Sequence, residues 1–262
     1  MKLDIYQKNL SQNKNTILFL PAFPTPKEMY INQIKFLEKE NIPFIALNYP
    51  GIGKSEKPNK IEMSIKELVE IILDNIKNLP FKGIIPIGTS MGGYVMFEIW
   101  RQYKDKVSGF VFCHTRAKAL DEESKKKRLS DIEKIQEDKE GYQKTFSQNL
   151  VSDYTKENRK EVVEFIDEII KDTTPEGLSA LVYVIATRPD SRELLKEIDV
   201  PSLVIGGKDD KIVPIEIVKY IADNLPNATF VEFETSGHMS PLEEPEKFNN
   251  ILLSFLTDKN LI

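Results

Sequence analysis

Ser90 lies between two glycines, in the stretch Gly88-Thr89-Ser90-Met91-Gly92, directly after an apolar run and directly before an amphipathic one. A serine at a sharp strand-to-helix turn takes up a strained backbone conformation, and its neighbours two positions away approach so closely that glycine is favoured there. Such a turn presents the serine hydroxyl above the sheet and leaves the N–H of Met91 free to face an oxyanion. The pattern predicts a nucleophilic serine, because it lacks the lysine and second hydroxyl residue of a phosphate-binding loop.

A serine nucleophile needs a base, and the base needs an acid that orients it. The chain has only two histidines, His114 and His238. His238 lies in a loop between the last apolar run and the last amphipathic stretch, at the rim where α/β sheets bind ligands. His114 comes directly after the run next in sequence to the Ser90 turn. We therefore predict His238 as the base. Asp209 and Asp210 follow another apolar run, and either would serve as the acid.

The elements that must position these residues alternate along the chain. Apolar runs predict buried strands at 16–20, 43–48, 83–88, 107–113, 202–205 and 229–233. Amphipathic stretches between them predict helices at 27–39, 64–78, 90–103, 215–224 and 245–256. In the second of these, Ser64 precedes Glu67 by three positions, as in a capping box. Apolar strands that alternate with helices indicate a mostly parallel sheet flanked by helices on both faces.

The alternation stops between 117 and 198, where strands disappear and three or four helical stretches follow. Apolar residues recur there at helical spacing, for example Leu129, Ile132 and Ile135. Because strands resume afterwards, we predict an α/β core domain formed by 1–116 and 199–262, with 117–198 inserted as a helical lid. The apolar stripes of this lid predict an enclosed, mostly apolar pocket above the sheet.

These motifs together resemble the α/β-hydrolase fold superfamily, over nearly the whole chain. The family's oxyanion loop corresponds to Pro21–Pro24, its P-G-x-G-x-S turn to Pro50–Ser55, its G-x-x-D-x-x-x-P motif to Gly207–Pro214, and its Gly-His pair to Gly237–His238. The resemblance implies Asp210 rather than Asp209 as the acid. It also implies a second oxyanion donor, the main-chain N–H of Phe23, although Pro21 and Ala22 stand where the family usually has His-Gly.

The chemistry implied by the resemblance is acyl transfer by a Ser90, His238 and Asp210 triad, with the N–H groups of Phe23 and Met91 as the oxyanion hole. No metal or organic cofactor is expected. Within the superfamily the chain is most similar to the esterase and 3-oxoadipate enol-lactonase-like branch, so we expect a carboxylesterase-like enzyme that acts on a small ester or a lactone. The alternatives are C–C bond hydrolysis by the same triad and a small-molecule receptor that retains the triad.

Other side chains have two interpretations each. Met239, beside the base, would line the substrate pocket or fill space over the final helix. Arg188 would steer a substrate carboxylate or form an ion pair with Asp190 at a helix end. Cys113 ends an apolar run without flanking glycines, so we predict a buried small side chain rather than a nucleophile. Trp100 is predicted in the core.

Composition narrows the class of function. The 262 residues, 40% of them hydrophobic, are enough for one sizeable core. The net charge of -5 and the pI near 5.4 argue against a nucleic-acid partner and a polybasic membrane contact. A single cysteine excludes an intramolecular disulfide and a cysteine metal cluster, and two histidines argue against a multi-histidine metal site. Without an N-terminal apolar segment or a run of about 18 apolar residues, the sequence predicts a cytoplasmic protein.

Overall fold

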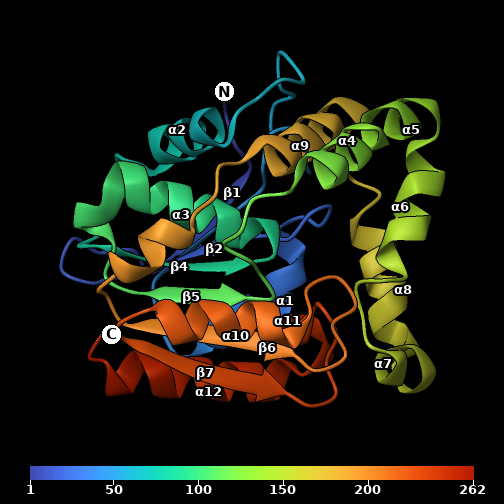
Figure 1. The fold of residues 1–262 in the computed structure, drawn as a ribbon. Coiled ribbons are helices and arrows are strands. Elements are labelled where there is room, and N and C mark those ends of the chain that lie inside the picture. The colour runs from blue at the N-terminus through green and yellow to red at the C-terminus, as the bar shows by residue number, and fades with distance from the viewer.

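The computed structural model describes all 262 residues and contains one sheet with the strand order β1-β3-β2-β4-β5-β6-β7 (Figure 1). Every pairing is parallel except that of β1 with β3. The strands are β1 (Ile5–Lys8), β2 (Thr16–Leu20), β3 (Phe44–Leu47), β4 (Ile84–Thr89), β5 (Phe110–Cys113), β6 (Ser202–Gly207) and β7 (Ala228–Phe233). All six strands expected from the apolar runs are therefore present, which confirms the mostly parallel α/β sheet.

The remaining strand, β1, was not expected from the sequence. It lies at the edge of the sheet, where Ile5 is half-buried and the next three residues are exposed. A strand with so little buried surface carries no apolar run, so its hydrogen bonds to β3 are the only feature that marks it. Its antiparallel direction follows from its position at the edge, where a mostly parallel sheet commonly carries such a strand.

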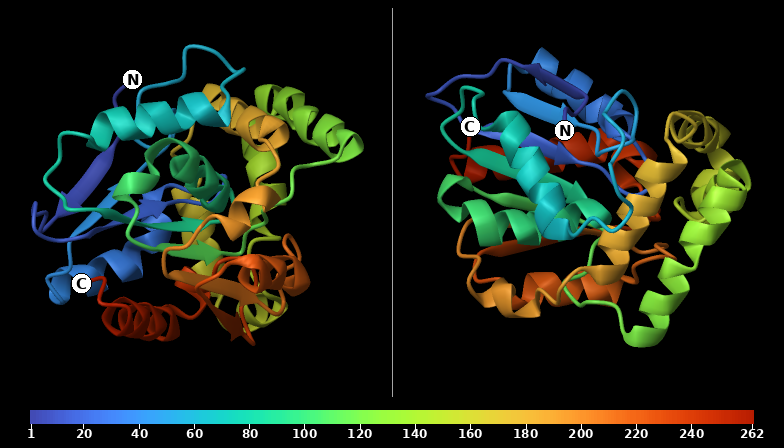
Figure 2. Two further views of the ribbon diagram at one scale, coloured as in Figure 1. Left: turned by 60° about the vertical axis from the view of Figure 1, so that its left-hand side comes forward. Right: turned by 90° about the horizontal axis from the view of Figure 1, so that it is seen from above.

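Helices cover both faces of the sheet (Figures 1 and 2). On one face lie α2 (Ile65–Ile76), α3 (Met91–Tyr103) and α10 (Ile215–Asn224), and on the other lie α1 (Ile31–Lys39) and α12 (Pro245–Asp258). Alternate residues of β2 divide between the two cores, Leu18 and Leu20 facing the first and Ile17 and Phe19 the second. Burial on both faces explains why the strands are continuous apolar runs.

The start of α2 agrees with the sequence. The Ser64 hydroxyl accepts a hydrogen bond from the Glu67 N–H, and the Glu67 carboxylate accepts one from the Ser64 N–H. This is the predicted capping box of α2. The structure also contains three short 3₁₀ turns and one four-residue helix. The turns are Lys27–Tyr30, Lys104–Lys106 and Arg192–Lys196, and the helix is α11 (Ser240–Glu243).

The segment 117–198 contains helices and no strand. Six helices, rather than the three or four expected, lie between β5 and β6: α4 (Glu122–Leu129), α5 (Asp131–Glu137), α6 (Lys139–Ser147), α7 (Asp153–Asn158), α8 (Lys160–Ile169) and α9 (Pro175–Thr187). The additional breaks fall at Asp138 and Arg159, whose non-helical backbones each divide a longer helical stretch in two. These helices stand beyond the carboxyl ends of the parallel strands (Figure 1).

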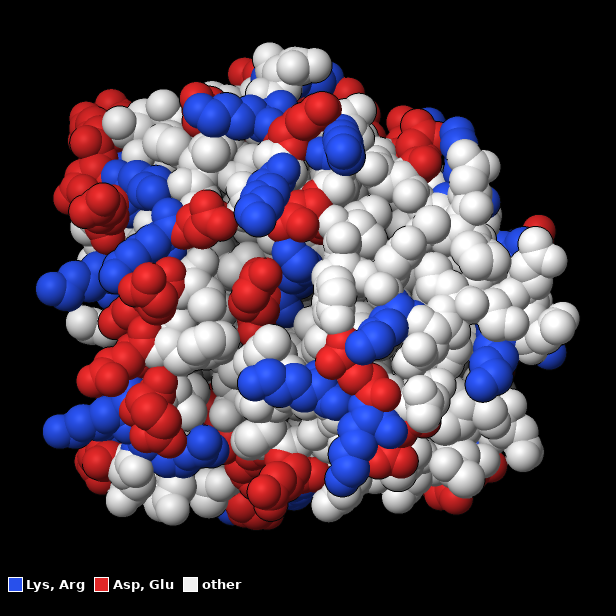
Figure 3. Space-filling model, turned by 180° about the vertical axis from the view of Figure 1, so that it is seen from behind, with Lys and Arg blue, Asp and Glu red and all other residues white.

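Figure 3 shows one face, on which lysines and arginines alternate with aspartates and glutamates and form no extended patch of one sign. No helix combines the length and the hydropathy that a membrane crossing requires.

Candidate active site

Ser90 occupies the turn between β4 and α3 with a left-handed backbone, φ 54° and ψ −110°. The turn is tight, because a Cβ on Gly88 would lie 2.5 Å from the carbonyl carbon of Gly92 and a Cβ on Gly92 would overlap the carbonyl oxygen of Leu20. The Ser90 N–H donates to the carbonyl of Cys113 at 2.8 Å, which connects the turn to the end of β5. Close packing between strand and helix is therefore the reason for both glycines.

Asp210 and His238 meet beyond the ends of β6 and β7. Both are buried, and His238 Nδ1 lies 2.8 Å from Asp210 Oδ2. The other carboxylate oxygen accepts the N–H groups of Ile212 and Val213, each at 2.9 Å. Burial alone would raise the pKa of Asp210, but the charge of His238 and the hydrogen bonds from His114 and His238 hold this pKa well below its usual range. An ionised carboxylate only accepts, so His238 Nδ1 carries a proton, and in the neutral imidazole Nε2 is then the acceptor.

His114 contacts the same carboxylate. Its Nδ1 lies 3.1 Å from Asp210 Oδ2, its Nε2 lies 2.7 Å from Ser240 Oγ, and its ring centroid is 5.7 Å from that of His238. The two histidines thus meet at one carboxylate, and the ligand atoms of His114, Asp210 and His238 lie within 4.8 Å of one another. Of the four ring nitrogens of the two histidines, only His238 Nε2 has no hydrogen-bond partner within the chain.

The neighbouring acid, Asp209, has a different role. Its Oδ2 accepts the N–H of Asp153 at 2.7 Å, at the start of α7, and it does not contact either histidine. The structure thus brings Asp210, and not Asp209, to the imidazole.

The two expected oxyanion donors are buried main-chain groups. Neither the N–H of Phe23, in the loop after β2, nor that of Met91, the first residue of α3, donates to an acceptor of the chain. Buried N–H groups are almost always paired, so two unpaired ones are a feature of the structure that needs an explanation. Ser90 Oγ and His238 Nε2 make no hydrogen bond in this structure; such catalytic hydrogen bonds often tighten only when substrate is bound.

Glu243 of α11 is a site residue that the sequence did not reveal. Its buried carboxylate accepts the N–H groups on both sides of His238, those of Gly237 and Met239, each at 3.0 Å, and the N–H of Ser152 at 2.8 Å. The His238 N–H donates to Leu150. Glu243 therefore fixes the loop that carries His238 to the segment 150–152. Glu243 belongs to a four-residue helix, and nothing in the local sequence indicates that its carboxylate is buried.

The comparisons with known proteins agree with the fold. The family model described as the alpha/beta hydrolase fold matches residues 15–245. The chain belongs to the α/β-hydrolase fold family. The structure of a thermophilic esterase from Thermogutta terrifontis is similar at 28% identity, with a TM-score of 0.88 and coverage of 98% of this chain and 94% of that one.

Two further α/β hydrolases represent the other reaction types. A 2-hydroxy-6-oxo-6-(2'-aminophenyl)hexa-2,4-dienoic acid hydrolase from Metapseudomonas resinovorans is 27% identical, over 81% of this chain and 73% of its own. The enol-lactonase from Burkholderia xenovorans shares the fold, with a TM-score of 0.81 at 21% identity and 97% coverage of both chains. Hydrolysis is thus supported, while the bond that is cleaved differs among these relatives.

The two side chains that the sequence suggested as pocket residues, Met239 and Arg188, are both buried. Met239 is fully covered in the core on the α1 and α12 face. The Arg188 guanidinium donates to the carbonyls of Ile185 and Lys118 and lies 3.8 Å from the ring centroid of Tyr94. The ion pair considered between Arg188 and Asp190 is absent, because Asp190 pairs with Arg192 instead. Cys113 and Trp100 are buried, as predicted.

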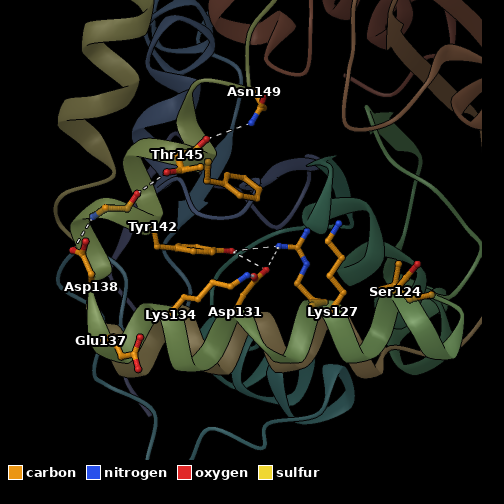
Figure 4. A pocket seen from close by; sticks show the side chains of 13 residues that line it. Ser124, Lys127, Asp131, Lys134, Glu137, Asp138, Tyr142, Thr145 and Asn149 are labelled. Carbon is orange, nitrogen blue, oxygen red and sulfur yellow. Dashed lines mark hydrogen bonds and ion pairs between the residues drawn. The ribbon is translucent and has the colours of Figure 1, made fainter.

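A groove of about 820 Å³ lies between α4–α5 and α6 and is lined mainly by residues of these three helices (Figure 4). Its centre is polar, where Arg128, Asp131 and Tyr142 form a hydrogen-bonded group. Tyr142 and Phe146 lie between this groove and Phe23, whose ring they contact edge-on. Most of the side chains that line the groove are polar or charged, so it differs from the mostly apolar pocket expected from the stripes of these helices.

Proposed function

We propose that this α/β hydrolase cleaves small carboxylic esters through an acyl-enzyme. Ser90 Oγ attacks the acyl carbonyl while His238 Nε2 takes its proton, and Asp210 holds the imidazole and stabilises the positive charge that forms on it. The N–H groups of Phe23 and Met91 bind the tetrahedral oxyanion. Protonated His238 then gives its proton to the leaving alcohol, and water activated by the same imidazole releases the acid.

The observation that carries this proposal is the state of His238. Its Nδ1 is held by an ionised, buried carboxylate, and its Nε2 has no partner within the chain. A histidine with one nitrogen fixed and the other free is prepared to accept a proton. The strained Ser90 turn supports the pairing, since it reaches the same edge of the sheet through Cys113, the residue before His114.

Ester cleavage is favoured by the similarity to the Thermogutta terrifontis esterase and by the surroundings of the oxyanion loop. Phe23 packs against Tyr142 and Phe146, which restricts the space beside the reacting carbonyl. We therefore propose short acyl groups. C–C bond hydrolysis is the second candidate, on the strength of the 27% identical dienoic acid hydrolase, and lactone opening needs only the same triad.

We further propose that 117–198 acts as a lid over this site, and that Met239 and Arg188 shape the pocket from behind. Met239 follows His238 and packs into the core on the α1 and α12 face. The Arg188 guanidinium stacks on the ring of Tyr94 in α3, four residues after Ser90. Neither side chain needs to touch the substrate in this role.

The test compares Ser90→Ala with the parent and with Ser130→Ala, an exposed serine of the same chain. Initial rates are measured on p-nitrophenyl esters of graded acyl length, on lactones and on a vinylogous diketone. We expect Ser90→Ala to fold normally and lose the hydrolase activity, and Ser130→Ala to keep it. Retention of activity within tenfold in Ser90→Ala would exclude the serine mechanism. Product formation that stops at one equivalent would instead indicate a receptor.

A further inference from the structure

His114 makes contacts that the proposed triad does not use. It is fully buried at the end of β5, with a left-handed backbone at φ 49°. A positive φ is uncommon outside glycine, although asparagine, aspartate and histidine adopt it more readily than other residues. Both of its ring nitrogens are engaged, one by Asp210 and the other by Ser240.

We propose that His114 is a positioning residue, whose Nδ1–H holds the Asp210 carboxylate against His238 and shares its negative charge. This inference rests on the proposed function, because it assigns the charge partner of the proposed base. The contacts form a chain from Ser240 Oγ through His114 to Asp210 Oδ2, and then to His238 Nδ1.

The proton positions along this chain follow from the acceptors. Asp210 Oδ2 accepts from both imidazoles, so each must carry a proton on Nδ1. One carboxylate balances one positive charge, and during the reaction that charge forms on His238; a second imidazolium would be a buried charge without a partner. His114 is therefore neutral, and the Ser240 hydroxyl donates to its Nε2. Ser240 thus fixes the tautomer that lets His114 donate to Asp210.

The second donor changes what Asp210 does for the base. A hydrogen bond to a carboxylate stabilises its charged form, so a carboxylate with two imidazole donors attracts a neighbouring proton less strongly than one with a single donor. Removal of one donor should therefore move the acid limb of the pH profile to higher pH.

The other ionisable groups around the pair do not duplicate this effect. Glu243 of α11 is occupied by the N–H groups of Gly237, Met239 and Ser152. Arg116, in the loop after β5, donates to the carbonyl of Ile212. Cys113 of β5 is buried, and burial raises its pKa.

The experiment measures the pH profile of kcat/KM for the parent, His114→Ala, His114→Asn and Ser240→Ala. His114→Ala removes the donor, and we expect the acid limb to move to higher pH by roughly half a unit to one unit. The plateau should fall by roughly ten- to a hundredfold, as the carboxylate loses its fixed orientation. Asparagine tolerates the left-handed backbone and keeps an N–H donor close to the place of Nδ1, so His114→Asn should keep the parent's acid limb. Ser240→Ala should shift it in the same direction as His114→Ala, by less.

Several results would overturn the inference. A uniform loss of rate in His114→Ala with an unmoved acid limb would mean that His114 only packs, and equal shifts in His114→Ala and His114→Asn would mean that the donor is irrelevant. If His114→Ala does not fold, as judged by thermal melting, an unmoved limb in Ser240→Ala decides against the proposal. Failure of the proposed function is distinguishable, because the parent itself would then show no hydrolysis and no labelling of Ser90 by a fluorophosphonate.

Discussion

Replacement of Asp210 by asparagine tests the acid, and Asp209→Asn is its matched control one residue away. The amide has one acceptor and one donor end, whereas Asp210 accepts at both oxygens, from Ile212 and Val213 at one and from His114 and His238 at the other. No orientation of the amide satisfies both sets. If its NH₂ group faces the two main-chain N–H groups, two buried hydrogen bonds are lost, at about 1–3 kcal/mol each.

The amide will therefore direct its NH₂ group to the imidazoles, which can adapt by moving their protons. His238 then carries its proton on Nε2, the nitrogen that must accept the serine proton, and it can no longer act as base. Loss of the correct tautomer in a serine protease triad costs about 10⁴-fold in kcat, equivalent to about 5 kcal/mol. We expect a loss of that order in kcat/KM for Asp210→Asn with a short p-nitrophenyl ester.

Asp209→Asn should change the rate by less than about threefold, since the asparagine oxygen can still accept the Asp153 N–H. The reverse ranking, or equal losses in the two variants, would refute the assignment of Asp210.

The pH dependence of folding stability gives an independent test of the same residue. The pKa of Asp210 is lowered in the folded state, so its ionised form stabilises the fold above the ordinary carboxyl value of about 3.9, and this contribution is lost as the pH falls below it. The difference in stability between the parent and Asp210→Asn should therefore narrow below about pH 4.

Three further predictions concern the base, the turn and the substrate. The kcat/KM of the parent should fall on the acid side with a midpoint at about pH 6.5. EDTA should leave the rate unchanged. Activity that is lost on dialysis against EDTA and restored by zinc would contradict the metal-free mechanism. Gly92→Ala forces a Cβ onto the Leu20 carbonyl and should cost about 1–3 kcal/mol in a denaturant titration. Gly141→Ala displaces the Asp138 carboxylate that caps α6 but gains helix propensity, at about 1 kcal/mol each, so its stability should stay near that of the parent. Equal stability of the two variants would contradict the close packing at the turn. Esters of about two to six acyl carbons should be the best substrates, because Phe23, Tyr142 and Phe146 restrict the site; preference for chains beyond about ten carbons would mean that the site is an open groove.

Several features were determined by the sequence alone, because their causes are local. Gly88 and Gly92 are required by contacts within one strand-turn-helix unit, and Ser64 with Glu67 caps a helix across three residues. The apolar runs that mark β2 to β7 report burial on both faces of a sheet, which needs no knowledge of the partner strands. The tight turn at Ser90, the order of the elements and the parallel sheet were therefore predictable.

Only the tertiary structure decided which side chains meet above the sheet. His114 and His238 share one carboxylate because β5, β6 and β7 are neighbours in the sheet, although His114 and Asp210 are 96 positions apart in sequence. The burial of Glu243 likewise depends on the packing of α11 against the segment 150–152. Residue type and spacing report local conformation and average burial, whereas the direction of a loop side chain depends on the elements packed around it, and those contacts come from distant parts of the chain.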